Sequence, residues 1–394
     1  MTSALVARGI ELAARTALTP LLLAARWTAR DVPPDAADVP APRRSVGLAL
    51  KIALDEVFFA TEVVTANIVS TADRTRIRDE MAAALTLYEE EGWLAEPAAY
   101  HRTPPAAALE EVGAARARGV RFRHLRFPSE YEPHPAEPGR ARWLGHVANQ
   151  TAHAWVLEHD GPPRPWLVCV PAYRMGHPLV DFTGFPAAWF HHRRGLNVVI
   201  PVLPLHGPRK SGWRSGDGFF SGDYVDTVHW QAQAVWDVRR LIAALRLRGA
   251  PAVGVYGVSL GGYTAAVIAA LETELACVIA GMPATCWVGV ARWNLPPFVC
   301  RLAETLGVPW TDVERLVRVV SPLALAPRVP RERRFLFAAT ADRLVPPHGV
   351  SALWRHWERP RLAWYDGSHV SFGVERTVRA LLREALETSG LVAA

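Results

Sequence analysis

From Val120 onward the sequence alternates short apolar runs with longer segments of helical periodicity, and this alternation limits the possible folds more than any other feature. Near-continuous apolar runs joined by helices are typical of parallel strands that are covered on both faces. The first two runs lead directly into one another and therefore predict an antiparallel edge. We expect an α/β fold with a mostly parallel eight-stranded sheet flanked by helices, the strands spanning 121–127, 151–158, 166–170, 197–202, 252–256, 276–280, 335–339 and 361–365.

The N-terminal part of the chain has a different texture. Residues 1–118 read as a helical extension without a strand pattern, and residues 119–394 as the catalytic domain. Residues 3–26 predict an amphipathic helix that packs on the parent domain, with contact to a membrane surface or a partner as the alternative. Neither this segment nor 46–70 has an uninterrupted apolar span of about 18 residues, so neither predicts a signal peptide or a membrane span. Charges interrupt both: Arg8, Glu11 and Arg15 in the first, and Lys51, Asp55, Glu56 and Glu62 in the second.

Composition excludes several classes of protein. Half of the 394 residues are hydrophobic, 21% are charged and mean hydropathy is +0.06, so the chain is neither disordered nor collagen-like. The net charge of +6 is spread along the chain without a basic stripe or a nucleic-acid motif, so we expect no nucleic-acid partner. The four cysteines form no CxxC pair, which indicates free thiols and a cytoplasmic protein.

One glycine-rich hexapeptide carries the strongest local signal. Gly257-Val258-Ser259-Leu260-Gly261-Gly262 directly follows the candidate strand 252–256 and precedes a helix-like run. A serine at a sharp strand-to-helix turn needs neighbours without side chains two positions before and after it. Gly257 and Gly261 meet that need, which predicts Ser259 as a nucleophile.

A serine nucleophile needs a base and a group that orients the base, and two later loops supply them. Asp342 follows the candidate strand 335–339, and His369 follows the strand 361–365. The chain order serine, acid, histidine at the ends of successive strands predicts a catalytic triad. Asp366 is a rival acid, but it stands only three residues before His369 and is less able to reach the far ring nitrogen.

GVSLGG, ADRLVP and GSH together resemble the nucleophile, acid and base motifs of the α/β-hydrolase superfamily, particularly its esterase and peptidase-like branches, over about residues 120–390. The resemblance implies Ser259 as nucleophile, His369 as general base and then general acid, and Asp342 as the orienting carboxylate. It also implies hydrolysis of an ester, amide or thioester through an acyl-enzyme, without a cofactor.

Acyl transfer also needs hydrogen-bond donors for the developing oxyanion. The backbone N–H of Leu260 is the first expected donor. The second should come from the loop after the strand 166–170, where many family members carry His-Gly and this chain has Pro171-Ala172. Because proline has no N–H, the donor falls to Ala172 or Tyr173.

The expected substrate site lies under an insertion of more than fifty residues between the strands 276–280 and 335–339. We expect a small helical cap at about 284–330 whose aromatic residues, Trp287 and Trp293 among them, either form an apolar acyl pocket or pack the cap on the core. His206 either lines this pocket or caps its own loop. No metal is expected, because Asp217, Asp223, Asp226 and His229 match no known ligand spacing and read as solvated loop residues.

The sequence thus predicts a serine hydrolase of carboxylesterase type that acts on a small ester with an apolar or aromatic acyl group. An acyltransferase or thioesterase with the same triad, and a catalytically degenerate binding module, are the alternatives. The sequence does not fix the oligomeric state.

Overall fold

The computed structural model describes residues 16–24, 26, 37–65, 73–305 and 309–393. Within them a nine-stranded sheet has the order β1-β2-β3-β5-β4-β6-β7-β8-β9. Pairing is antiparallel from β1 to β5 in that order and parallel from β5 to β9, so the predicted antiparallel edge is confirmed. The strands are β1 (Glu110–Ala117), β2 (Val120–Pro128), β3 (Thr151–Leu157), β4 (Trp166–Val170), β5 (Asn197–Val202), β6 (Val253–Val258), β7 (Val278–Gly281), β8 (Arg334–Ala339) and β9 (Arg361–Tyr365).

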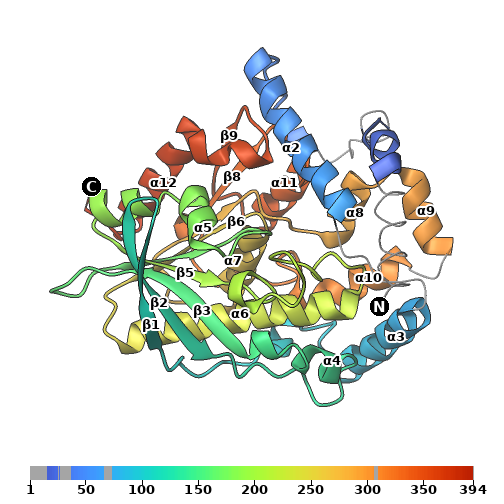
Figure 1. The fold of residues 1–394 in the computed structure, drawn as a ribbon, viewed down its shortest axis with the longest axis horizontal. Helices are drawn as coiled ribbons and strands as arrows, with labels where there is room; N and C mark the ends of the chain where they lie inside the picture. Colours follow the sequence, from blue (N-terminus) through green and yellow to red (C-terminus); the bar gives the residue numbers. More distant parts are fainter. Residues whose placement is uncertain (1–15, 25, 27–36, 66–72, 306–308, 394) are drawn as a thin grey trace.

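Helices cover both faces of this sheet (Figure 1). One apolar core joins the sheet to α6, α7 and α11, and the other joins it to α5 and α12. The helices are α2 (Val46–Thr65), α3 (Arg74–Glu90), α4 (Arg140–Leu144), α5 (Pro178–Gly184), α6 (Tyr224–Leu247), α7 (Leu260–Leu271), α8 (Trp287–Asn294), α9 (Pro297–Thr305), α10 (Trp310–Leu316), α11 (Pro347–His356) and α12 (Arg376–Thr388). A short 3-10 helix, η9 (His369–Val374), begins at the candidate catalytic histidine.

The expectation that no strand precedes Val120 is wrong, because β1 adds a ninth strand at the edge of the sheet. Seven of its eight residues are exposed, so the strand has no buried apolar face to produce the alternation by which strands are recognised. A two-residue turn through Arg118 and Gly119, both with positive φ, joins β1 to β2. Cross-strand ion pairs from Arg126 to Glu110 and from Arg123 to Glu111 accompany the pairing.

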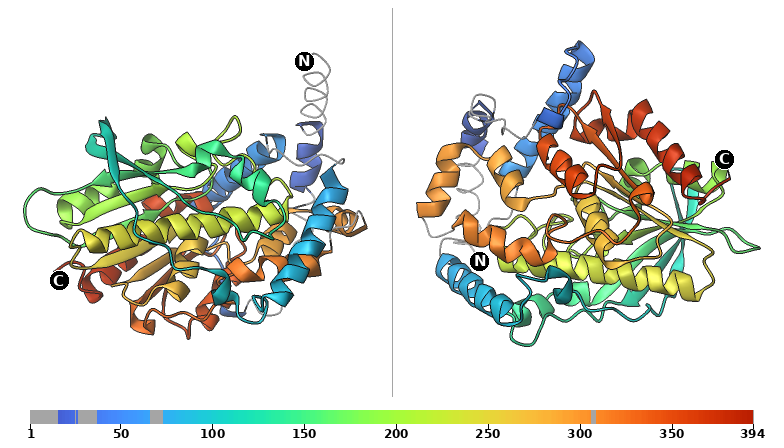
Figure 2. Two further views of the ribbon diagram at one scale, coloured as in Figure 1. Left: turned by 90° about the horizontal axis from the view of Figure 1, so that it is seen from below. Right: turned by 180° about the vertical axis from the view of Figure 1, so that it is seen from behind.

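Two helices of the N-terminal region pack on the rest of the molecule from different sides (Figure 2). Helix α2 packs against η9, and α3 packs against α6 and α10. Residues 16–24 are helical, while the rest of the expected amphipathic helix at 3–26, except residue 26, lies outside the described residues. None of the described helices is long and apolar enough to cross a membrane.

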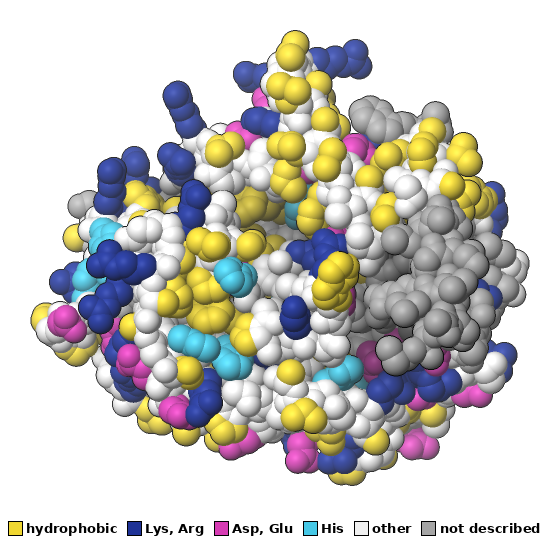
Figure 3. Space-filling model, viewed as in Figure 1, with side chains coloured by type: hydrophobic (Ala, Val, Ile, Leu, Met, Phe, Trp, Pro, Cys, Tyr) yellow, Lys and Arg dark blue, Asp and Glu magenta, His cyan; other side chains and the backbone are white. Residues whose placement is uncertain are grey.

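Helix α2 has an unusual distribution of side chains. Its buried residues are Leu48, Asp55 and Glu56, so two of the three carry a carboxyl group. Its outer face carries exposed aliphatic side chains, which form part of the hydrophobic surface over α2 in Figure 3: Val46, Leu50, Leu54 and Val57.

Candidate active site

Ser259 lies at the sharp turn between β6 and α7. Its backbone has φ 56° and ψ −115°, a conformation that is strained for a residue with a side chain. A Cβ atom at Gly257 would come within 2.0 Å of the carbonyl oxygen of Gly261, and a Cβ at Gly261 within 2.0 Å of that of Val170. The two glycines are therefore required by backbone contacts, and the turn leaves Ser259 partly exposed at the carboxyl end of β6.

His369 and Asp342 meet at the same end of the sheet, in the loops after β9 and β8. Nδ1 of His369 is 2.6 Å from Oδ2 of Asp342, while Oδ1 of Asp342 accepts hydrogen bonds from the backbone N–H groups of Leu344 and Val345. Because the carboxylate accepts, Nδ1 carries the proton and Nε2 is left as the basic nitrogen. Burial alone would lower the pKa of His369, but the charge and hydrogen bond of Asp342, together with the charge of Asp55, raise it.

Asp366 does not reach the imidazole. Its side chain is 41% exposed and accepts from the hydroxyl of Thr340 and the backbone N–H of Arg43. Among the described residues, no hydrogen bond joins Oγ of Ser259 to His369. The structure therefore brings the acid and the base into direct contact and presents the serine at the same edge of the sheet.

Two sets of backbone groups were expected to form the oxyanion hole. Leu260 is the first residue of α7, where backbone N–H groups have no partner within the helix. In the loop after β4, the N–H of Ala172 points at Sδ of Met175 at 3.1 Å, a weak acceptor that a developing oxyanion could replace. The side chain of Tyr173 makes a separate contact, in which its hydroxyl donates to Glu62 of α2 at 3.2 Å.

The three expected substrate-binding residues have different surroundings. Trp287, at the start of α8, is buried and its ring centroid lies 4.6 Å from that of Tyr263 on α7. His206 is 1% exposed, with its ring edge-on to Tyr173 and Nδ1 2.8 Å from the carbonyl of Pro204; burial lowers its pKa to about 4. Trp293 is half-buried and packs edge-on against His348, at the start of α11.

The expected cap segment contacts the acid loop. It contains α8, α9, α10 and the 3-10 helix η7 (Val317–Val320). Nδ2 of Asn294, the last residue of α8, donates to the carbonyl of Leu344 at 2.7 Å. The segment therefore reaches the loop that carries Asp342.

Residues that the sequence did not single out also contact these loops. Both carboxylate oxygens of Asp55 on α2 accept backbone hydrogen bonds from the loops of Asp342 and His369. Further along α2, Glu62 binds Arg174 of the loop after β4, with Oε2 2.6 Å from Nη2. The detectable signal was the interruption of an otherwise apolar helical segment by charged residues.

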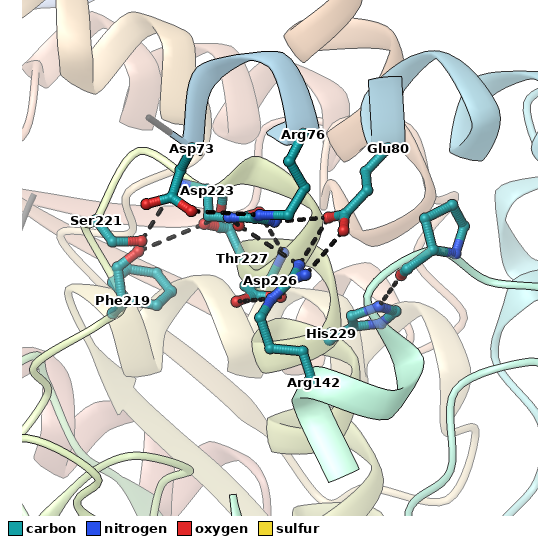
Figure 4. Close-up of polar contacts among 11 residues, drawn as sticks. Asp73, Arg76, Glu80, Arg142, Phe219, Ser221, Asp223, Asp226, Thr227 and His229 are labelled. Carbon is teal, nitrogen blue, oxygen red and sulfur yellow. Dashed lines mark hydrogen bonds and ion pairs between the residues drawn. The ribbon is translucent and has the colours of Figure 1, made fainter. Parts of the chain in front are cut away.

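The expectation that Asp217, Asp223, Asp226 and His229 are solvated loop residues is wrong. Asp217 is buried against Arg174, and His229 is fully buried with Nε2 bonded to the carbonyl of Pro138. Asp223 caps α6 and, with Asp226, belongs to the ion-pair network in Figure 4. The sequence could not reveal this, because the partner arginines lie on other elements that are distant in the chain: Arg174 in the loop after β4, Arg142 on α4 and Arg76 on α3.

That network fastens α3 to helices α4 and α6. Arg142 of α4 binds Glu80 of α3 through two hydrogen bonds of 2.8 Å, and Asp226 of α6 through another of 2.8 Å. Arg76 of α3 lies 2.9 Å from Asp223. In Figure 4 the side chains of α3, α4 and α6 converge on one polar cluster. No group suited to holding a metal ion occurs among the residues that the structure describes.

Comparison with solved structures identifies the fold. Acetyl xylan esterase 1 from Thermoanaerobacterium sp. superposes with a TM-score of 0.54 at 15% identity, over 76% of this chain and 93% of the other. An acetyl xylan esterase from Paenibacillus sp. R4 gives 0.50 at 16% identity, over 81% and 96%. The protein has the α/β-hydrolase fold, as its motifs predicted.

The family is defined by closer relatives. Two Mycobacterium tuberculosis proteins, named uncharacterized protein MT2702 (strain CDC 1551) and uncharacterized protein Rv2627c (strain H37Rv), are each 38% identical to this chain over 363 residues. The alignments cover 90% of this chain and 85% of each relative, so the chain belongs to their family. No protein-family profile matches the sequence.

Proposed function

We propose that this protein is a serine hydrolase that cleaves a carboxylic ester with an apolar or aromatic acyl group, with Ser259 as nucleophile. The observation that carries the proposal is the 2.6 Å hydrogen bond between His369 and Asp342, at the sheet edge where Ser259 occupies the strained turn. Both superposed structures are acetyl xylan esterases, which is consistent with an ester substrate.

The proposed reaction uses each of these groups in turn. Nε2 of His369 takes the proton of Ser259 as Oγ forms a bond to the carbonyl carbon, and the carbonyl electron pair moves onto oxygen. When the tetrahedral intermediate collapses, the bond to the alkoxy group breaks, and the departing oxygen takes the proton from His369. Water, deprotonated by the same nitrogen, then attacks the acyl carbon. The bond between that carbon and Oγ of Ser259 breaks, and His369 returns the proton to Oγ as the acid leaves.

The environment of the imidazole supports these roles. Asp342 holds the Nδ1–H tautomer and stabilises the imidazolium that forms in each half of the reaction. In unliganded enzymes the hydrogen bond between nucleophile and base often forms only when substrate binds, so we assign the Ser259 contact to the Michaelis complex. The N–H groups of Leu260 and of Ala172 or Tyr173 would bind the oxyanion, and Trp287, Trp293 and His206 would border the acyl group.

The proposed location is the cytoplasm. All four cysteines, Cys169, Cys277, Cys286 and Cys300, are free thiols.

The cysteines do not compete with Ser259 as nucleophile. Burial raises the pKa of each thiol, so none is an activated thiolate that could replace the serine.

A fluorophosphonate probe tests the assignment, because it reacts with activated serines. We expect stoichiometric labelling of the wild type and none of Ser259→Ala, with the modified peptide containing Ser259. Hydrolysis of p-nitrophenyl esters of increasing acyl length then reports the size of the acyl site. A folded wild type that is neither labelled nor active would refute the proposed enzymatic activity and favour a catalytically degenerate binding module.

The same assay separates hydrolysis from acyl transfer. If an added alcohol or thiol receives the acyl group in preference to water, with the rate of p-nitrophenol release rising accordingly, the protein is an acyltransferase. We expect water to be the acceptor.

A further inference from the structure

Helix α2 presents a charged face to the candidate active site. Lys51, Asp55 and Glu62 are spaced by four and seven residues, which places them on the same side of a helix. The usual arrangement of a surface helix is reversed, because this helix buries carboxylates and exposes aliphatic side chains. A helix that buries charge must obtain compensating contacts from the surface it covers.

Asp55 obtains those contacts from the two loops that carry the acid and the base. Oδ2 accepts from the backbone N–H groups of Arg343 and His369, each at 2.9 Å, and Oδ1 accepts from Val370 at 3.1 Å. Arg343 follows Asp342 directly in the chain. One carboxylate therefore bridges the loop of the acid to the loop of the base.

The bridge is shielded from solvent. Asp55 is 0% exposed, and its burial and the nearby charge of Asp342 raise its pKa. Hydrogen bonds between a buried carboxylate and backbone N–H groups are stronger than those between neutral groups, and the low local dielectric strengthens them further. The bridge consequently restricts the separation of the two loops.

Neighbouring contacts hold α2 in place over these loops. Glu56 binds Nε of Arg343 at 2.6 Å and Nη1 of Arg26 at 3.1 Å. Towards the other end of the charged face, Lys51 lies 2.6 Å from Glu375, directly after η9. Figures 1 and 2 show α2 beside the C-terminal part of the chain, where these contacts form.

We propose that Asp55 is a positioning residue of the active site, which fixes the His369 loop against the Asp342 loop so that their hydrogen bond is formed before substrate binds. This inference rests on the proposed function and assigns part of the catalytic geometry to the N-terminal helix. Asp55 itself contacts backbone groups of the two loops and does not act on the substrate.

The electrostatic surroundings of His369 make the role measurable. Two carboxylates, Asp342 and Asp55, favour the charged imidazole. The other nearby charges are paired: Arg343 and Arg26 with Glu56, and Lys51 with Glu375. Removing the charge of Asp55 should therefore lower the pKa of His369, a change that a general loss of stability would not produce.

Asp55→Asn is the direct test. All three contacts of Asp55 are N–H donors, so a carboxamide of the same shape must turn its own NH₂ group towards at least one of them. We expect the second-order rate constant of fluorophosphonate labelling to fall about 10- to 100-fold, the magnitude typical of small displacements in an active site. The kcat for a p-nitrophenyl ester should fall with KM little changed, and the acid limb of the pH profile should move to lower pH.

Glu80→Gln is the matched control, because it breaks a partly buried ion pair of α3 that lies outside the catalytic loops. It should lower stability and leave the labelling rate unchanged. If Asp55→Asn does not fold, Asp55→Glu is measured instead; it keeps the charge but displaces the oxygens by one methylene, so the rate should fall and the acid limb should stay.

Two results would overturn the positioning role: Asp55→Asn labelled at the wild-type rate with an unmoved acid limb, or Glu80→Gln slowed as much as Asp55→Asn. Either would leave the proposed function intact, since the wild type would still be labelled at Ser259. A wild type that is not labelled would refute the proposed function and this inference with it.

Discussion

At the scale of single residues, the contact between His369 and Asp342 distinguishes the two carboxylates that the sequence offered as partners for the base. Asp342 is 3% exposed and bonded to Nδ1, whereas Asp366 is partly exposed and bonded elsewhere. Asp342→Asn should lower kcat on the order of 10³- to 10⁴-fold, because the amide no longer holds the required tautomer or stabilises the imidazolium. The kcat of Asp366→Asn should stay within about threefold of the wild-type value. The reverse pattern in steady-state assays would assign the role of orienting carboxylate to Asp366.

The protonation of His369 determines the pH dependence. A general base must be neutral, and the pKa of His369 is raised above its ordinary value of 6.5 by Asp342 and Asp55 in spite of burial. The acid limb of kcat/KM should therefore have its midpoint above pH 6.5, with activity rising as the pH increases through it. In Asp342→Asn the residual activity should have its midpoint at lower pH, because the charge and hydrogen bond of Asp342 are lost while burial remains. A midpoint that does not move would contradict the assignment.

At the scale of elements, the turn between β6 and α7 has no space for side chains. Ala at position 257 or 261 would place a Cβ atom 2.0 Å from a backbone oxygen, which only backbone movement can relieve. Gly257→Ala and Gly261→Ala should each lower the free energy of unfolding by about 3 kcal/mol or more and abolish labelling of Ser259. Gly47→Ala, at an open position in α2, should not lower stability, since alanine favours helix. Urea denaturation of the three variants compares them directly.

The second contact of α2 affects the loop after β4. Glu62 binds both Arg174 and Arg214, and its loss leaves both guanidinium groups without this carboxylate, with Arg174 still bound to Asp217. Glu62→Gln should lower kcat about tenfold with little change in KM, because the loop proposed to supply an oxyanion donor becomes less fixed. Glu89→Gln, which breaks an exposed ion pair, is the control and should have no effect. Equal kcat values for the two variants would show that the contact between α2 and the loop after β4 does not affect catalysis.

Local patterns predicted the elements that the sequence determines locally. The parallel strands were recognisable because both faces are buried, as in β4 and β6, and the nucleophile turn because steric necessity requires Gly257 and Gly261. Strand β1 escaped detection because its register comes from pairing with β2 and not from burial. The role of Asp55 could not be foreseen, because its partners lie 288 to 315 positions further along the chain.

At the scale of the whole molecule, the N-terminal region is attached through two separate sets of charged contacts. Helix α2 binds the loops of the candidate active site, and α3 binds α4 and α6 through Arg142 and Arg76 (Figure 4). Each set consists of partly or fully buried groups, for which the removal of one partner leaves the others with an uncompensated desolvation cost. We therefore expect that removing an α2 contact lowers catalysis, and that removing an α3 contact lowers stability without affecting catalysis.

The α3 contacts provide the last prediction. Arg142→Gln leaves Glu80, Asp223 and Asp226 without their shared cation and should lower the free energy of unfolding at pH 7 by about 2 kcal/mol, a value reduced for partial exposure. Burial alone would raise the pKa of Glu80, but Arg142 and Arg76 lower it below its ordinary 4.5. A carboxylate with a lowered pKa stabilises the folded state above its unfolded pKa and loses that contribution as the pH falls through the folded value.

The difference between the wild type and Arg142→Gln, as measured by urea denaturation, should therefore narrow mainly as the pH falls below about 4.5. Labelling of Ser259 at pH 7 should be the same in both proteins, because the network does not contact the catalytic loops. A stability difference that is independent of pH would assign the effect of Arg142 to packing of its side chain. Slower labelling of Arg142→Gln would mean that the α3 contacts also affect the active site.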